Sequence, residues 1–255
     1  KRDYVWLFGG PSPTELLMVD FKDKPGEFQL RSRGLDFSTC NSSISDNDGN
    51  LLFYTNGCAV ADSTHQIMPN GDSINAGPFF DLFWLGDCAY GYPGPQDIII
   101  IPDPYDIMGY YILHKPTEYV PEQNPSIFID KIKYTYVDMS LNDGLGDVTI
   151  KNKTLLKGEL LGSYLTAISH SNKLDWWVIQ PKENSNIYYK ILINSSDKIS
   201  IDSQSIGLKF DPKFASDGGE SRFSPDGTKY AYFNLIDGLY LFDFDRDNGL
   251  LSNFK

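Results

Sequence analysis

The chain has 255 residues, enough to bury a sizeable core, and it carries 22 basic against 34 acidic side chains, a net charge of −12. This charge argues against nucleic acid as a partner and against binding to an anionic membrane surface. No apolar run approaches the roughly 18 residues that a membrane-spanning helix needs. Sixteen Tyr, sixteen Phe and four Trp, with many turn-forming residues, indicate a β-rich protein.

The N-terminal segment, residues 1–33, contains two short apolar stretches of strand length. They cover residues 4–8 and 16–21 and are joined by Gly-Gly-Pro-Ser-Pro. In a β-propeller, an N-terminal pair of strands commonly joins the last blade and closes the ring. We therefore predict that residues 1–33 close a propeller.

A hairpin signal then follows at Asp46-Asn47-Asp48-Gly49, which leads directly into the apolar run 51–55. Asp-Gly readily adopts the positive φ values of a tight turn, so the chain is expected to reverse here and continue as a strand. The same order of turn and aromatic strand returns at residues 224–233. Looser copies cover residues 98–113 and 165–179.

These copies recur at intervals of roughly 55 to 65 residues, as expected for repeated sheets. Strands are expected in four groups, namely residues 36–71, 98–148, 164–199 and 220–254. The proline-containing loop 115–126 is predicted to be exposed, and no helical periodicity is present. The sequence therefore predicts an all-β, WD40-like β-propeller, with about four blades in residues 34–255. The ring is expected to be incomplete, as part of a longer propeller.

Several segments of the sequence resemble one protein family. They cover residues 41–57, 137–148, 175–179, 223–227 and 241–253. In this order they are similar to the N-terminal β-propeller-like region of secreted Bacteroidota proteins that carry type IX secretion or gliding-motility-associated C-terminal domains. The resemblance implies export to the outer-membrane cell surface or the extracellular space. It also implies a protein or glycan partner there, with components of the type IX secretion system among the candidates.

The chain has three cysteines. Cys58 and Cys88 fall in connections that emerge on the same face of a propeller, so we predict a disulfide between them. It would close a loop of about 30 residues and stabilise the fold by roughly 3 kcal/mol. Cys40 lies in an expected inner strand and is predicted to be a small buried hydrophobe. The alternative is that all three are free, buried thiols.

No motif names a catalytic residue, a metal ligand or a cofactor site. His65, His114 and His170 lack the spacing of a metal site, and no Gly-x-Ser-x-Gly elbow is present. The run of alternate aspartates at 243–247 fails the calcium-loop template at its glycine and glutamate positions. Asp217 and Glu220 could act as a general acid and base in a glycosidase-like cleft, but a sequence does not give their separation.

One loop and two turns are candidates for binding and modification. The loop 77–92 is rich in aromatic residues, which either pack over the propeller or offer a binding surface. The binding-loop candidates are Phe79, Phe80, Phe83, Trp84, Tyr90 and Tyr92. Ser63 and Ser73 stand in Asp-Ser-Thr and Asp-Ser-Ile, which resemble the O-glycosylation pattern of exported Bacteroidota proteins.

Together these patterns predict a secreted, non-catalytic β-propeller that binds a protein or ligand at the cell surface, as an adhesin-like or assembly component. No cofactor is predicted. Two alternatives remain open. One is a propeller hydrolase of the lactonase type, with its chemistry near the central axis. The other is a subunit of an outer-membrane type IX secretion or gliding assembly.

Overall fold

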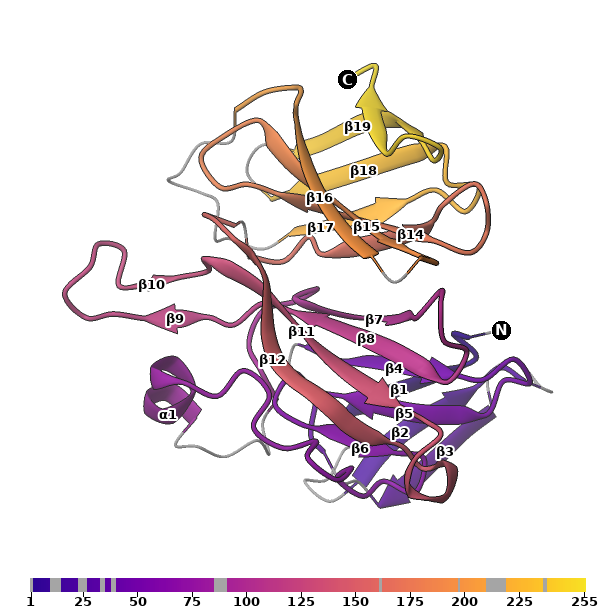
Figure 1. Cartoon of the computed structure of the whole chain (residues 1–255). Helices are drawn as coiled ribbons and strands as arrows, with labels where there is room; N and C mark the ends of the chain where they lie inside the picture. Colours follow the sequence, from indigo (N-terminus) through magenta and orange to yellow (C-terminus); the bar gives the residue numbers. More distant parts are fainter. Residues whose placement is uncertain are drawn as a thin grey trace.

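The computed structural model describes residues 2–9, 15–22, 27–32, 35–37, 40–84, 91–160, 162–196, 198–209, 219–235 and 238–255. The fold is all-β, with antiparallel sheets that follow one another along the chain (Figure 1). The predicted fold class, a β-propeller with an incomplete ring, is confirmed.

The first two sheets have three strands each. They consist of β1 (Val5–Gly9), β2 (Glu15–Asp20) and β3 (Glu27–Ser32), and of β4 (Ser42–Ser45), β5 (Leu51–Thr55) and β6 (Val60–Asp62). The predicted turn between β4 and β5 is confirmed, and Gly49 has φ 88°. The Asp46 carboxylate accepts the N–H groups of Asp48 and Asn50, each at 2.8 Å. These hydrogen bonds within the turn stabilise the chain reversal locally.

The next three sheets have four strands each. The third contains β7 (Ile98–Pro102), β8 (Gly109–His114), β11 (Lys131–Asp138) and β12 (Asp147–Lys157). The fourth contains β13 (Thr166–Ser169), β14 (Trp176–Pro181), β15 (Ile187–Asn194) and β16 (Lys198–Ser205). The fifth contains β17 (Gly219–Phe223), β18 (Lys229–Asn234), β19 (Gly238–Asp245) and β20 (Leu250–Ser252).

Three further elements lie outside these sheets. They are helix α1 (Pro78–Trp84), the 3-10 turn η2 (Asn142–Gly144) and the small hairpin of β9 (Glu118–Tyr119) and β10 (Ile127–Phe128). The prediction that the chain has no helix was wrong at α1. Proline suits the first position of a helix, because its missing N–H is not needed there. The helix has seven residues, too few for an amphipathic period to be visible in the sequence.

The innermost strands lie side by side in the order β1, β4, β7, β13 and β17. The five sheets therefore fan about a common axis as blades, and the described strands form no closed ring. The first three strands make a blade of their own, which packs beside β4. The suggestion that residues 1–33 close a ring stays a prediction.

Apolar side chains fill the space between neighbouring blades. Between the second and third blades, the rings of Phe53 and Tyr110 meet edge to face, with centroids 5.4 Å apart. Between the fourth and fifth, Tyr188 and Phe242 meet in the same way at 5.4 Å. Each such fully buried ring contributes about 2 kcal/mol by burial of apolar surface. Packing of these apolar side chains thus holds neighbouring blades together.

Each of the two end blades exposes large apolar side chains on one face. On the first blade the exposed side chains are those of Trp6, Phe8, Phe28 and Leu30. On the fifth blade they are those of Phe233, Leu239 and Leu241. The inner blades instead have a neighbouring blade on both sides.

His114 is fully buried between the second and third blades. Its Nδ1 lies 2.6 Å from the amide oxygen of Asn75, and its Nε2 lies 3.0 Å from Oγ1 of Thr135. This geometry suits a neutral ring that donates to Asn75 and accepts from Thr135. Burial, with a smaller effect of the Lys133 charge, lowers the pKa of His114 to about 3.

Acid is therefore expected to destabilise the fold through His114. Because its folded pKa lies below the unfolded value, the stabilisation is present above pH about 6.5 and is lost as the pH falls toward 3. The free energy of unfolding should fall by up to about 1.4 kcal/mol per pH unit in that window. His114→Gln should flatten this dependence in urea titrations, whereas His170→Gln should keep it. Equal slopes in all three proteins would contradict the assignment.

Candidate active site

The predicted cysteine pair is not decided by the structure. Cys58 is fully buried against Phe79, Phe80 and Tyr92, and Cys88 lies outside the described residues, so the disulfide stays a prediction. No disulfide is present in the part of the chain that the structure describes. Cys40 is buried as predicted, and burial raises the pKa of its thiol.

The aromatic loop largely packs inward. Phe79, Phe80 and Tyr92 are buried, and Phe79 lines a cavity. Tyr90 lies outside the described residues, and the side chains of Phe83 and Trp84 lie outside them too. A binding role for this loop stays a prediction. The glycosylation candidates Ser63 and Ser73 are both exposed in turns, and their modification also stays a prediction.

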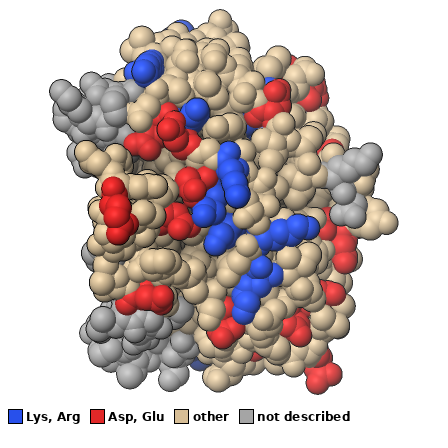
Figure 2. All heavy atoms as spheres, turned by 60° about the vertical axis from the view of Figure 1, so that its left-hand side comes forward, with Lys and Arg blue, Asp and Glu red and all other residues tan. Residues whose placement is uncertain are grey.

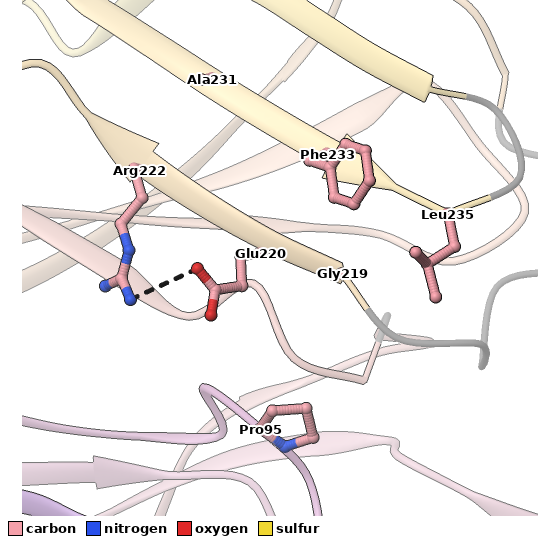
Figure 3. Close-up of a pocket in the computed structure, with 7 residues that line it drawn as sticks. All are labelled: Pro95, Gly219, Glu220, Arg222, Ala231, Phe233 and Leu235. Carbon is pink, nitrogen blue, oxygen red and sulfur yellow. Dashed lines mark ion pairs between the residues drawn. The ribbon is translucent and has the colours of Figure 1, made fainter.

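The paired acids of the sequence do not form an acid–base pair among the described residues. Asp217 lies outside them, and Glu220 forms an exposed ion pair with Arg222 at 3.5 Å. Figure 3 shows these two side chains pointing toward one another beside a cavity of about 440 Å³. Its other lining residues are Pro95, Gly219, Ala231, Phe233 and Leu235. A carboxylate that is paired with a cation, with no second acid among the described lining residues, is poorly suited to general acid–base catalysis.

A second cavity, of about 380 Å³, combines apolar walls with a few converging polar groups. Such a lining is typical of a site for a small molecule. The polar side chains are those of Asp97, Ser163, Glu183 and Thr117. The remaining lining residues are Phe79, Pro93, Gly94, Pro95, Pro125, Ile127, Phe128, Ile129, Leu160 and Gly162.

Asp97 and Lys115 lie side by side because of strand pairing. Asp97 comes directly before β7 and Lys115 directly after β8, and Ile98 pairs with His114 in the ladder. The Lys115 Nζ lies 2.8 Å from Oδ1 of Asp97, and the two side chains are 0% and 2% exposed. The prediction that the loop starting at Lys115 is exposed was wrong at this residue. The fourth blade covers it.

The fourth blade completes the surroundings of this ion pair. Lys115 Nζ donates to the carbonyl oxygen of Ser163, and to Oε1 of Gln180 at 3.0 Å. The backbone N–H of Ser163 donates to Oδ1 of Asp97 at 2.6 Å. A buried charge without such partners would be costly, so these bonds keep the carboxylate in place at the cavity wall.

The backbone around Asp97 is unusual in four places. Gly94 has φ 107°, and a Cβ there would lie 1.9 Å from Oδ2 of Asp97, so only glycine lets the chain pass the carboxylate. Gln96, Ser163 and Tyr164 also adopt positive φ, at 59°, 66° and 65°. Such conformations cost non-glycine residues about 1 kcal/mol or more each, and they cluster at functional sites.

Gln96 fastens this strained loop to the fifth blade. Its side-chain amide donates to the carbonyl oxygen of Ser221 at 2.8 Å, and its Oε1 accepts the Ser221 N–H at 2.9 Å. The loop is thus held by the fourth blade as well as by the fifth, since the Leu165 N–H donates to the Gln96 carbonyl oxygen at 3.1 Å. Ser163 lines the cavity, and its hydroxyl makes no hydrogen bond within the described part of the chain.

Two carboxyl groups of the cavity have shifted pKa values. Burial raises the pKa of Asp97, and Lys115 and the Ser163 N–H oppose this shift. Burial and then the charge of Glu159 raise the pKa of Glu183. Glu159 is positioned beside Glu183 because the Glu183 N–H donates to its carbonyl oxygen at 3.2 Å. Glu183 has no opposing cation among the causes of its shift, so it can keep its proton nearer to neutral pH and act as a general acid, whereas Lys115 favours the charged form of Asp97.

Segments outside the blades cover the cavity. Pro125, Ile127 and Phe128 belong to the β9–β10 hairpin, and Phe79 belongs to α1. Figure 1 shows the hairpin and α1 projecting on the same side of the molecule. Their apolar side chains lower the polarity around Asp97 and Glu183, which strengthens electrostatic interactions there.

No membrane-spanning helix is found, since no described helix is both long and apolar enough to cross a bilayer. The described residues also contain no group of three or more His, Cys, Asp or Glu side chains that could hold a metal ion.

The chain matches no protein-family model and no curated protein. The resemblance to secreted Bacteroidota proteins therefore stays a prediction. Among solved structures, it is similar to a protein named as a 6-phosphogluconolactonase from Bacteroides uniformis. That likeness has 14% identity and a TM-score of 0.43, and covers 98% of this chain and 67% of the other.

Two further solved structures are similar. A protein named as a 6-phosphogluconolactonase from Bacteroides fragilis has 12% identity and a TM-score of 0.41, over 99% of this chain and 82% of its own. The periplasmic gluconolactonase PpgL of Pseudomonas aeruginosa has 13% identity and a TM-score of 0.43, over 99% and 72%. These neighbours carry enzyme names, and the prediction of a non-catalytic binding module is wrong on this finding. At this similarity they do not indicate the chemistry of this chain, which has to be argued from the cavity.

Proposed function

We propose that the protein is a hydrolase that opens a small, uncharged ester of the lactone type in the cavity lined by Asp97, Ser163 and Glu183. The observation that carries the proposal is a carboxylate fixed by a buried lysine, in the same small cavity as a second carboxyl group with a raised pKa. Paired carboxyl groups in different environments are a common arrangement for a general base and a general acid.

In the proposed reaction, Asp97 takes a proton from a water molecule, whose oxygen then bonds to the ester carbonyl carbon. The Ser163 hydroxyl donates a hydrogen bond to the carbonyl oxygen as negative charge develops there. The bond between the carbonyl carbon and the ring oxygen breaks, and Glu183 gives its proton to that oxygen. The product is a hydroxy acid, and the proton held by Asp97 returns to Glu183 through solvent.

The size and charge of the cavity support the substrate class. A volume of about 380 Å³ suits a compact ring, and its apolar walls suit a substrate without charge. A neighbouring cavity shares Glu183 and is also lined by Asp130 and Glu159. A phosphorylated substrate would meet these carboxylates, and its binding would be disfavoured by like charge.

The test is hydrolysis of glucono-1,5-lactone, followed by acid release in a pH-stat and corrected for the spontaneous rate. Because Glu183 has to be protonated, kcat/KM should fall as the pH rises through its raised pKa. Glu183→Gln should lower kcat by about 10²-fold and remove this descending limb. Glu220→Gln, in the cavity of Figure 3, should leave the rate unchanged. A wild-type rate equal to the spontaneous rate for this and other uncharged lactones would overturn the proposal.

A further inference from the structure

Lysines gather on one hairpin of this acidic protein. The chain has a net charge of −12, yet strands β11 and β12 alone carry five lysines, namely Lys131, Lys133, Lys151, Lys153 and Lys157. Figure 2 shows a nearly continuous band of Lys and Arg side chains across the side of the molecule that Figure 1 has at its left. The proposed hydrolytic reaction does not use these lysines.

Strand pairing places like charges next to one another on this hairpin. Lys131 and Lys157 are direct partners across the β11–β12 ladder, an arrangement that destabilises a sheet. Burial and the neighbouring Lys131 lower the pKa of Lys133. The fold therefore accommodates electrostatic repulsion between lysines of this hairpin.

Two of the five lysines are neutralised, and three are not. Lys131 pairs with Glu118 at 2.9 Å and with Asp130 at 3.3 Å, and Lys151 pairs with Asp72 at 3.0 Å. For the other three, the described residues provide no ion pair, and Lys153 lies over the ring of Tyr134 at 5.6 Å. The uncompensated lysines are Lys133, Lys153 and Lys157.

The same hairpin also has a free backbone edge. β12 is the outermost strand of its sheet, and its first half is covered, because the Val148 N–H donates to the carbonyl oxygen of Pro69 at 3.2 Å. From Lys153 to Lys157 the outer edge forms no hydrogen bond with any described residue. Unpaired backbone groups on such an edge are a ready template for another strand.

We propose that the edge of β12 from Lys153 to Lys157 binds an extended acidic peptide segment of a partner protein, which adds to the sheet as a further strand. A register shift at Leu155 places Lys157 on the face of Lys131 and Lys153 on the opposite face, with Tyr134, so an added strand with acidic residues on both of its faces would match the two lysines. A second copy of β12 would instead be repelled by its own lysines. The positive charge of this edge therefore favours an acidic peptide over a second copy of β12.

The probe is a fluorescein-labelled peptide of seven residues, Thr-Glu-Glu-Thr-Glu-Glu-Thr, which carries acidic residues on both faces of a strand, and its binding is followed by anisotropy. The wild-type protein should bind it, and Lys153→Glu with Lys157→Glu should weaken binding by about tenfold, as expected for the loss of two exposed pairs. Exchange of two exposed lysines elsewhere, Lys173→Glu with Lys255→Glu, should leave binding unchanged. Thermal unfolding of all three proteins checks that each is folded.

A second peptide separates strand pairing from simple attraction of charge. It has the same sequence with N-methyl groups on alternate backbone amides, so it keeps its charge and loses backbone donors. We expect it to bind at least about tenfold more weakly, since several strand hydrogen bonds are lost. Equal binding of the two peptides, equal competition by short-chain polyphosphate, or no binding of the first peptide would each overturn the proposal.

Discussion

Replacing Lys115 with methionine is expected to lower the free energy of unfolding by about 3–5 kcal/mol, because the Asp97 carboxylate would be left buried without its cation. Lys115 also donates to the Ser163 carbonyl oxygen and to Gln180, so the substitution removes three interactions at once. The loss should be measured by urea unfolding, followed by tryptophan fluorescence.

The double variant Lys115→Met with Asp97→Asn tests the cause. It removes both charges, and methionine has nearly the length of the lysine stem, so much of the lost stability should return. If the double variant were as unstable as Lys115→Met alone, the uncompensated carboxylate would not be the source of the loss. Lys173→Met, at an exposed position, should change stability by less than about 0.5 kcal/mol.

Asp97→Asn is expected to lower kcat for lactone hydrolysis by about 10²–10⁴-fold, because an amide does not accept the proton of the attacking water. The KM should change much less, since the amide keeps nearly the same shape. Asp103→Asn is a matched control. Asp103 is also buried, where its carboxylate accepts the hydroxyl of Tyr136 at 2.8 Å, but it does not line this cavity.

In the double variant Lys115→Met with Asp97→Asn, stability should recover while activity should not. It is expected to regain stability and yet stay as inactive as Asp97→Asn, since neither substitution restores a base. Recovery of activity together with stability would mean that Asp97 acts only through folding. Activity of Asp97→Asn close to that of the wild type would remove it as the general base.

Much of the fold follows from short-range patterns. The four apolar residues Ile98 to Ile101 predict a strand buried on both faces, and the Asp-Gly turns at Gly49 and Gly227 predict hairpins; all are present. β3 was missed, because the alternating polar residues from Glu27 to Ser32 give it a weak strand signal. Helix α1 was missed because it is shorter than two helical repeats.

The candidate site could not be predicted from motifs. Asp97 and Lys115 are 18 positions apart and become neighbours only through the register of β7 and β8. When the strand pairing is not known, Lys115 stands at the start of a proline-containing loop, and such a position suggests a lysine exposed to solvent. Glu183 and Glu159 are likewise joined by a contact between loops. An acid–base pair has no required sequence spacing, so the lack of a nucleophile motif was weak support for a non-catalytic protein.

The exposed outer faces of the first and fifth blades matter for the stability of the candidate site. Asp97 and Lys115 belong to the third blade, and Ser163 and Glu183 to the fourth, and both blades are flanked on either side. Fraying that starts at the first blade would therefore have to cross the second blade before it reached a reacting group. Loosening of the fifth blade would reach the site sooner, because Ser221 of that blade holds Gln96, the residue before Asp97.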